Sequence, residues 1–325
     1  MKKFASLILT SVFLFSSTQF VHASSTDVQE RLRDLAREDE AGTFNEAWNT
    51  NFKPSDEQQF SYSPTEGIVF LTPPKNVIGE RRISQYKVNN AWATLEGSPT
   101  EASGTPLYAG KNVLDNSKGT MDQELLTPEF NYTYTESTSN TTTHGLKLGV
   151  KTTATMKFPI AQGSMEASTE YNFQNSSTDT KTKQVSYKSP SQKIKVPAGK
   201  TYRVLAYLNT GSISGEANLY ANVGGIAWRV SPGYPNGGGV NIGAVLTKCQ
   251  QKGWGDFRNF QPSGRDVIVK GQGTFKSNYG TDFILKIEDI TDSKLRNNNG
   301  SGTVVQEIKV PLIRTEIHHH HAHHH

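Results

Sequence analysis

The chain has 325 residues, a length typical of two domains or of one long molecule built from several parts. It carries 34 Lys and Arg against 30 Asp and Glu, a formal net charge of +4 that is too balanced for a nucleic-acid-binding protein. The single cysteine, Cys249, excludes an intrachain disulfide and a cysteine-rich metal site. Apolar content is only 34%, but aromatic content is 10%. We therefore expect an elongated β protein with thin cores rather than a disordered chain.

Residues 1–23 have the features of a secretory signal peptide. Lys2 and Lys3 precede an apolar stretch over residues 4–20, and Ala23 provides a small residue at the expected cleavage position. The pattern predicts that the protein is secreted. Loss of the two lysines leaves 32 basic against 30 acidic residues, a net charge of +2.

The histidines argue against an enzyme. Of the nine, one lies in the leader, seven lie in the C-terminal tail over residues 314–325, and His144 is the only one in the body of the chain. We therefore expect no catalytic residues and no cofactor. The sequence offers no metal ligands beyond a tag-like run in the tail, which includes His318, His319, His320 and His321.

Helical spacing is clearest in the N-terminal part. Between residues 27 and 40 four apolar residues recur at helical intervals and predict a helix that ends at Gly42: Val28, Leu32, Leu35 and Ala36. Three aromatic residues then repeat every four positions and predict a second short helix before Pro54: Phe44, Trp48 and Phe52. These aromatics are interpreted either as core residues or as an exposed patch that contacts a receptor.

From Phe60 onward, short apolar runs separated by Pro, Gly, Asn and Ser are typical of an all-β chain. Between Thr127 and Ser191, Ser and Thr supply 23 of 65 residues. A strict period of two argues against a low-complexity linker there. Even-numbered positions carry the less polar residues in the first half: Leu146, Leu148, Val150, Thr152, Ala154, Met156, Phe158 and Ile160.

The parity of the pattern inverts after residues 162–163. Odd-numbered positions now carry the less polar set: Met165, Ala167, Thr169, Tyr171 and Phe173. This inversion predicts an amphipathic hairpin with a loop near residues 159–164, in which Phe158 faces Met165 and Lys157 faces Glu166. A strand over residues 146–158 would span about 43 Å, enough to cross an apolar layer about 25 Å tall even when it is tilted.

Two interpretations of the hairpin remain. It is either a half-buried element of a soluble sheet or a strand pair of a transmembrane barrel, which several chains must close together. The flanking segments, residues 131–144 and 175–186, consist mostly of Ser, Thr and Asn. Such strands suit a hydrated barrel wall better than a soluble core.

Residues 132–228 resemble the epsilon-toxin/mosquitocidal-toxin family of aerolysin-type β-pore-forming toxins. The resemblance rests on the Thr-rich run at 141–145, the hairpin, and the segment PSQKIKVPAGKTYRVLAYL at 190–208, with a later match over 271–311. It implies an elongated, mainly β toxin with long antiparallel strands, an insertion hairpin and a small N-terminal helical part. We expect a receptor-binding head over 24–95 and 222–265, and a β body over 96–221 and 266–313.

The resemblance also implies a mechanism. The secreted protoxin binds a cell-surface receptor, is activated by a host protease and assembles into a homo-oligomer, usually of seven copies. Its hairpins, Leu146–Phe173, then insert into the target-cell plasma membrane. We expect an insecticidal toxin that binds no nucleic acid.

Residue roles follow from the same resemblance. The membrane-inserting set is the apolar face: Leu146, Leu148, Val150, Ala154, Met156, Phe158, Ile160, Met165, Ala167, Tyr171 and Phe173. The pore-lumen set is Lys147, Lys151, Lys157, Glu166 and Glu170, three positive against two negative, which predicts a weak anion preference. Ala23 is the signal cleavage site, and the candidate activation sites are Arg31, Arg33, Arg37, Lys309 and Arg314. The receptor-binding candidates are Phe44, Trp48 and Phe52.

Two other classes of function remain as alternatives. A secreted lectin or adhesin would stack sugars on exposed aromatics such as Trp228, Tyr234 and Trp254 and would leave membranes sealed. A β-rich glycoside hydrolase would need a pair of carboxylates, and no such pair stands out in the sequence.

Overall fold

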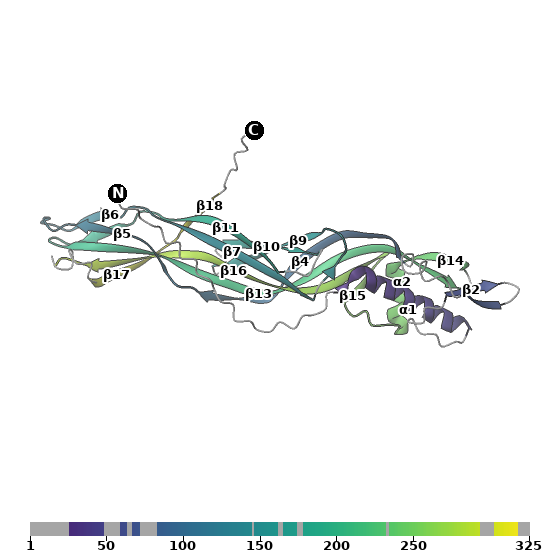
Figure 1. Ribbon diagram of the computed structural model, residues 1–325. Coiled ribbons are helices and arrows are strands. Elements are labelled where there is room, and N and C mark those ends of the chain that lie inside the picture. The colour runs from purple at the N-terminus through teal and green to yellow at the C-terminus, as the bar shows by residue number, and fades with distance from the viewer. Residues whose placement is uncertain are drawn as a thin grey trace, which may run out of the picture.

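The computed structural model describes residues 26–48, 59–63, 67–71, 83–144, 146–161, 165–173, 178–231, 234–292 and 302–317. The molecule is a long rod whose strands run along its axis (Figure 1). Strand makes up 68% of the described residues and helix 13%, which confirms the mainly β fold with an N-terminal helix. The predicted leader, the histidine run of the tail and Phe52 lie outside the described residues. The division into head and body remains a prediction.

One ten-stranded antiparallel sheet forms the rod. Its order along the main path is β14-β13-β16-β7-β11-β18, with β4 and β5 pairing with β13, and β15 and β17 pairing with β16. Four strands form its centre: β13 (Thr201–Ser231), β16 (Asp266–Asp289), β7 (Phe130–His144) and β11 (Thr178–Ser189). The others are β4 (Ile83–Ser103), β5 (Leu107–Asp115), β14 (Tyr234–Asn241), β15 (Phe260–Ser263), β17 (Thr303–Val310) and β18 (Ile313–Glu316).

Four two-stranded sheets complete the strand inventory of the described segments. Three are antiparallel: β9 (Thr153–Ile160) with β10 (Met165–Asn172), β6 (Gln123–Leu126) with β12 (Lys193–Val196), and β2 (Gln59–Ser63) with β3 (Gly67–Leu71). The fourth is a short parallel bridge between β1 (Thr26–Asp27) and β8 (Leu146–Lys147).

Two helices, α1 (Val28–Trp48) and α2 (Ile242–Lys252), lie together at one end of the rod (Figure 1). The predicted apolar stripe of α1 is buried, as expected. The predicted helix end at Gly42 and the separate second helix are wrong, because α1 continues without a break to Trp48. A side chain at Gly42 would meet the ring of Trp254 at 2.3 Å, so the glycine allows a close contact within the helix rather than ending it. Neither described helix is long and apolar enough to span a bilayer.

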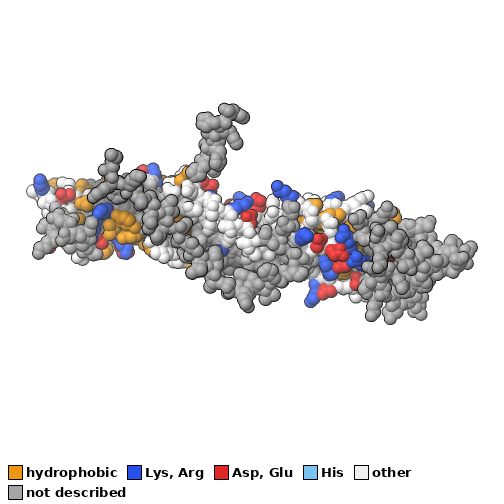
Figure 2. All heavy atoms as spheres, in the orientation of Figure 1, with side chains coloured by type: hydrophobic (Ala, Val, Ile, Leu, Met, Phe, Trp, Pro, Cys, Tyr) orange, Lys and Arg blue, Asp and Glu red, His pale blue; other side chains and the backbone are white. Residues whose placement is uncertain are grey.

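The rod has two separate hydrophobic cores. The helix-end core joins α1, α2, the β9–β10 hairpin and the facing side chains of β13 and β16. The far-end core joins β13 and β16 to β5, β11, β12 and β17. Hydrophobic side chains are also visible on the surface at the end away from the helices (Figure 2). These two cores agree with the low apolar content, because each strand covers a core on one face only.

Candidate membrane-insertion site

The hairpin β9–β10 is the centre of the candidate site. Ile160 pairs with Met165, and Phe158 pairs with Ala167. The predicted pairing of Phe158 with Met165 is therefore wrong by two residues, and the loop is shorter than predicted. Pro159 and Ile160 continue the strand, and the chain turns only at Ala161, whose φ is +51°. A shift of two residues leaves every side chain on its predicted face.

The two faces of the hairpin differ as the alternation predicts. One face is buried in the helix-end core and consists of Ala154, Met156, Phe158, Ile160, Thr169, Tyr171 and Phe173, with Met165 and Ala167 partly buried beside them. The opposite face is exposed and carries Thr153, Thr155, Lys157, Pro159, Glu166 and Ser168. Lys157 and Glu166 still form an ion pair, 3.0 Å from Nζ to Oε1, although they are no longer directly opposite.

Specific contacts hold the apolar face against the rod. The rings of Phe158 and Phe275 lie 4.3 Å apart between centroids. The Tyr171 hydroxyl donates to the carbonyl of Thr274 at 3.2 Å, and burial raises the pKa of this hydroxyl. On β7, the Asn140 amide donates to the Thr169 hydroxyl at 2.9 Å. The hairpin thus docks through side chains.

The base of the hairpin departs from the predicted continuous strand over residues 146–158. The strand breaks after Lys147, at Gly149, whose φ of +71° favours glycine. Tyr86 donates from its hydroxyl to the carbonyl of Leu148 at 2.9 Å, which holds the break in place. As a result Val150, predicted for the apolar face, is 39% exposed, and Lys151 is exposed beside it.

The base is also joined to the N-terminal segment. Asp27 lies beside Lys147 in the β1–β8 bridge, and their charged atoms are 3.6 Å apart. Leu146 and Leu148 are buried against the same core as the first turns of α1. The predicted lumen residue Lys147 therefore has a carboxylate partner in this form of the protein.

Serine and threonine fill the strands that flank the hairpin. β7 and β11 pair along their length. The first pair is Phe130 with Ser189, and the last is Thr141 with Thr178. Hydroxyl groups contact one another across strands, as between Thr141 and Thr178 at 2.9 Å. Polar side chains thus stabilise a sheet region that has little apolar area to bury.

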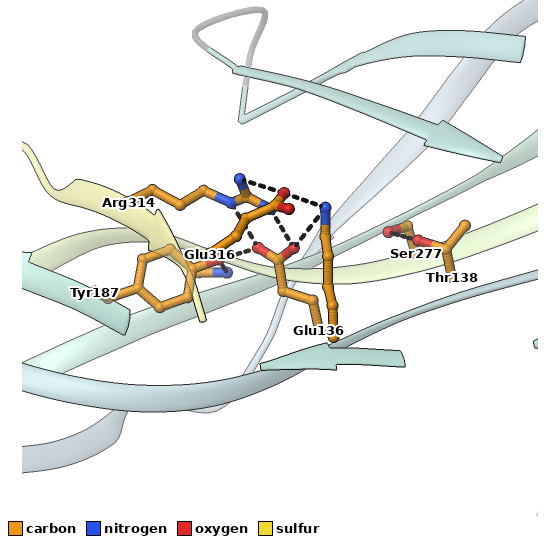
Figure 3. Close-up of polar contacts among 8 residues, drawn as sticks. Glu136, Thr138, Tyr187, Ser277, Arg314 and Glu316 are labelled. Carbon is orange, nitrogen blue, oxygen red and sulfur yellow. Dashed lines mark hydrogen bonds and ion pairs between the residues drawn. The ribbon is translucent and has the colours of Figure 1, made fainter. Parts of the chain in front are cut away.

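A charged cluster fixes the C-terminal strand β18 to the outer edge of β11 (Figure 3). Glu136 of β7 is buried and accepts two hydrogen bonds from Arg314 of β18, at 3.0 and 2.6 Å, and another from the hydroxyl of Tyr187. Lys183 bonds Glu316 of β18 at 2.6 Å. The hydrogen bond to Glu136 raises the pKa of Arg314, and burial raises that of Tyr187.

The sequence did not single out Glu136. Its signal was available, because Glu136 is the only charged residue between Phe130 and Thr143. A lone carboxylate in a Ser/Thr-rich strand that faces inward needs a cationic partner. The identity of that partner, Arg314, depends on a contact 178 positions away in sequence and could not be read from the pattern.

The predicted activation residues lie in regular elements. The α1 arginines pair with acidic neighbours: Arg31 with Asp34, Arg33 with Glu30, and Arg37 with both acids. A hydrogen bond from Arg33 is the main cause of the lowered pKa of Glu30. At the other end the Lys309 side chain is 73% exposed, whereas that of Arg314 is only 24% exposed.

The aromatic candidates are not gathered into one site. Phe44 and Trp48 belong to α1, but their side chains, like that of Tyr234, are outside the described part of the molecule. Trp228 is 47% exposed. Trp254 packs against Gly42, and its ring centroid lies 4.9 Å from Nζ of Lys248. In the described segments no three or more His, Cys, Asp or Glu residues come together as metal ligands.

The family model for Clostridium epsilon toxin ETX/Bacillus mosquitocidal toxin MTX2 matches residues 51–302, most of the chain. The chain belongs to this family. The membership confirms the resemblance seen in the sequence and identifies an aerolysin-like β-pore-forming toxin family. The hairpin therefore occurs in a chain whose family forms pores, which bears directly on how its two faces are interpreted.

One solved structure of high sequence identity agrees with this assignment, and others are more distant. The Mpp75Aa1.1 beta-pore-forming protein from Brevibacillus laterosporus is 98% identical over 91% of this chain and 99% of that chain, with a TM-score of 0.80. A chain of the Cry23Aa1 and Cry37Aa1 binary protein complex is 16% identical over 86% of this chain and 98% of that chain, with a TM-score of 0.46. A non-toxic crystal protein from Bacillus thuringiensis is 17% identical over 79% and 94%, with a TM-score of 0.47. A comparison with curated proteins gave no match.

Proposed function

We propose that this toxin is secreted, binds a receptor on a target cell, loses a terminal segment to a host protease and assembles into a ring. Each copy then inserts the hairpin of residues 146–173, and the hairpins together close a β-barrel pore in the plasma membrane. We expect seven copies in the ring and an insect as target, because the matched family includes a mosquitocidal toxin. No enzyme activity is part of this proposal.

The observation that carries the proposal is the independence of the hairpin from the main sheet. In the described structure β9 and β10 form a separate two-stranded sheet, with side-chain contacts to the rod. The hairpin can therefore leave the rod without breaking the ladder of the ten-stranded sheet; only the short β1–β8 bridge at its base must open. Its apolar face would exchange protein neighbours for lipid chains, so little hydrophobic stabilisation is lost in the transfer.

The flanking strands are suited to extend the barrel. Asn140 of β7 pairs with Asp179 of β11, and Phe158 of β9 pairs with Ala167 of β10. In both ladders an even-numbered residue of the first strand faces an odd-numbered residue of the second. The two faces of the hairpin can therefore continue into β7 and β11 without inversion. We propose that the polar face, with Lys147, Lys151, Lys157, Glu166 and Glu170, lines the lumen and gives a weak anion preference.

The C-terminal strand supports an activation step. β18 pairs with residues 185–188 of β11, on the edge that β11 would need for pairing with a neighbouring hairpin in a closed barrel. We propose that cleavage near the C-terminus removes this strand. Lys309 is the more accessible of the two basic candidates, and cleavage after it would release the whole of β18 together with Val310, the last residue of β17.

A reversible tether tests whether the hairpin moves. Asn140 and Thr169 contact each other in the soluble form, so Asn140→Cys with Thr169→Cys can join β7 to the hairpin. In a continuous barrel wall Thr169 would stay beside Met156, 16 positions from Asn140, or about 50 Å along the strand. The natural Cys249 is buried and does not compete for oxidation.

We expect the oxidised variant to bind vesicles made from target-cell membranes and to retain their dye, and the reduced variant to release it. Asn140→Cys alone is the matched control and should release dye under both conditions. Dye release by the oxidised double variant at the rate of the control would exclude insertion of this hairpin. Binding without release by every form would favour a lectin or adhesin.

A further inference from the structure

The far end of the rod ends in a four-stranded sheet with two open edges. Its order is β5-β13-β16-β17, and within the described residues β5 pairs only with β13 and β17 only with β16. Both edge strands carry exposed apolar side chains: Tyr108 and Val113 on β5, at 52% and 50%, and Val304 and Val305 on β17, at 49% and 47%. Open edges with apolar side chains are surfaces that pair with other strands.

The directions of the two edges are complementary. β5 is antiparallel to β13, β13 to β16, and β16 to β17. β17 therefore runs antiparallel to β5. A second copy placed with its β5 beside this β17 would continue the same antiparallel alternation.

We propose that copies of this toxin associate by pairing β17 of one copy with β5 of the next. The inference rests on the proposed assembly and specifies the surface that makes it. The contact is heterologous, since one edge meets a different edge, and repetition about an axis along the strands closes a ring. Under such rotation each residue keeps its level along the axis.

The strand register shows which residues of the four strands lie side by side, at one level along the rod axis. Val113, Arg203, Glu288 and Val304 share one level across the four strands. The next level on the same face runs from Lys111 through Leu205 and Lys286 to Glu307, and a third runs from Tyr108 through Tyr207 and Ile284 to Lys309. At each level one residue lies on the edge strand β5 and one on the edge strand β17, and these are the residues that another copy can contact.

Joining two copies brings these ends together. Val304 meets Val113 of the next copy, an apolar pair. Glu307 meets Lys111, which adds a second cation to the one it already has in Lys286 at 3.3 Å. Lys309 meets Tyr108, which allows a cation–π contact. On the opposite face of the sheet, Gln306 meets Asn112 of the next copy by the same register.

The edge also has a feature that limits premature pairing. Val305 is an extra residue in β17, where the register shifts between Ile287 and Glu288 of β16. A bulge on an edge strand weakens pairing with a second chain. Concentration of copies on a membrane would overcome this barrier, whereas dilute copies would remain apart.

A disulfide between copies tests the geometry. Within one chain Val113 and Val304 are three strand spacings apart, about 14 Å, which is beyond the reach of about 7 Å for a disulfide. A chain with Val113→Cys and Val304→Cys can therefore cross-link only to another copy. We expect an oxidised ladder of multimers on denaturing, non-reducing gels after assembly on target-cell vesicles. The control chain pairs Val113→Cys with Leu126→Cys, an exposed residue of the separate β6–β12 sheet, and should give no ladder.

Charge reversal tests the energetics. We expect Lys111→Glu and Glu307→Lys each to slow assembly at least about tenfold, because like charges then meet between copies. The two changes in one chain restore the attraction and should restore the rate. An assembled wild type with no cysteine ladder, or with a double variant as slow as the single ones, would overturn the edge pairing. A wild type that neither assembles nor releases dye would instead refute the proposed function on which the inference rests.

Discussion

At the scale of single residues, Glu136 is the position where a small change should weaken the docking of β18 most. Its carboxylate is buried and accepts hydrogen bonds from Arg314 and Tyr187. Glu136→Gln keeps the shape and removes the charge, which leaves the Arg314 guanidinium without its main partner. We expect the docking of β18 to weaken by about 2 kcal/mol, so its amides should exchange with solvent about thirtyfold faster.

A matched control lies at one end of the same pair of strands, where Glu129 directly precedes β7 and Lys188 belongs to β11. Glu129 and Lys188 form an ion pair at 2.7 Å, and both side chains are more than 40% exposed. Glu129→Gln should change amide exchange in β18 by less than about fivefold, because exposed pairs contribute little. Equal effects of the two changes would show that burial of Glu136 does not anchor the C-terminal strand.

The same cluster predicts a response to acid. A hydrogen bond from Lys183 is the main cause of the lowered pKa of Glu316. A carboxylate with a lowered pKa in the folded form stabilises it above its ordinary pKa, and this contribution is lost as the pH falls through the lowered value. We expect β18 to detach more readily below about pH 4. Amide exchange corrected for its intrinsic pH dependence measures this, and Glu316→Gln should remove the step.

At the scale of elements, the hairpin shows which structural features a sequence pattern predicts and which it does not. The period of two placed every side chain of β9 and β10 on the observed face. The pattern did not fix the partner of each residue, because a shift of two keeps the faces unchanged. The break at Gly149 was also missed, since it depends on Tyr86 and on the β1–β8 bridge, which are distant in sequence. Gly42 was misread for the same reason, as its contact with Trp254 is tertiary.

Two adjacent residues test the assignment of the faces in the membrane. Ala167 is partly buried on the apolar face, and its neighbour Ser168 is exposed on the polar face. In the proposed barrel Ala167→Lys places a charge toward lipid at about 2–4 kcal/mol per copy, whereas Ser168→Lys places it in the lumen. We expect dye release to fall at least about tenfold for Ala167→Lys and to be retained for Ser168→Lys. Similar activity of both variants, with similar binding, would contradict the assignment.

At the scale of the whole molecule, the rod is closed at both places where the barrel would form. The hairpin is held against the helix-end core, and the edge of β11 is covered by β18. The sequence resemblance predicted that an end must be trimmed, but only the fold shows which strand lies against which edge. Removal of β18 alone uncovers β11 and leaves the far-end core complete, whereas a cut after Lys309 also takes Val310, a buried residue of that core.

A truncated chain separates strand removal from other effects of a protease. A variant that ends at Val310 keeps β17 and loses β18, together with Arg314 and Glu316. Because Glu136 then loses its cationic partner on β18, we expect the truncated chain to be less stable than the full chain but still folded. It should assemble and release dye from target-cell vesicles without protease, at least about tenfold faster than the untreated full chain. If the truncated chain still needs protease, the activating cut lies elsewhere, and the α1 arginines become the sites to change next.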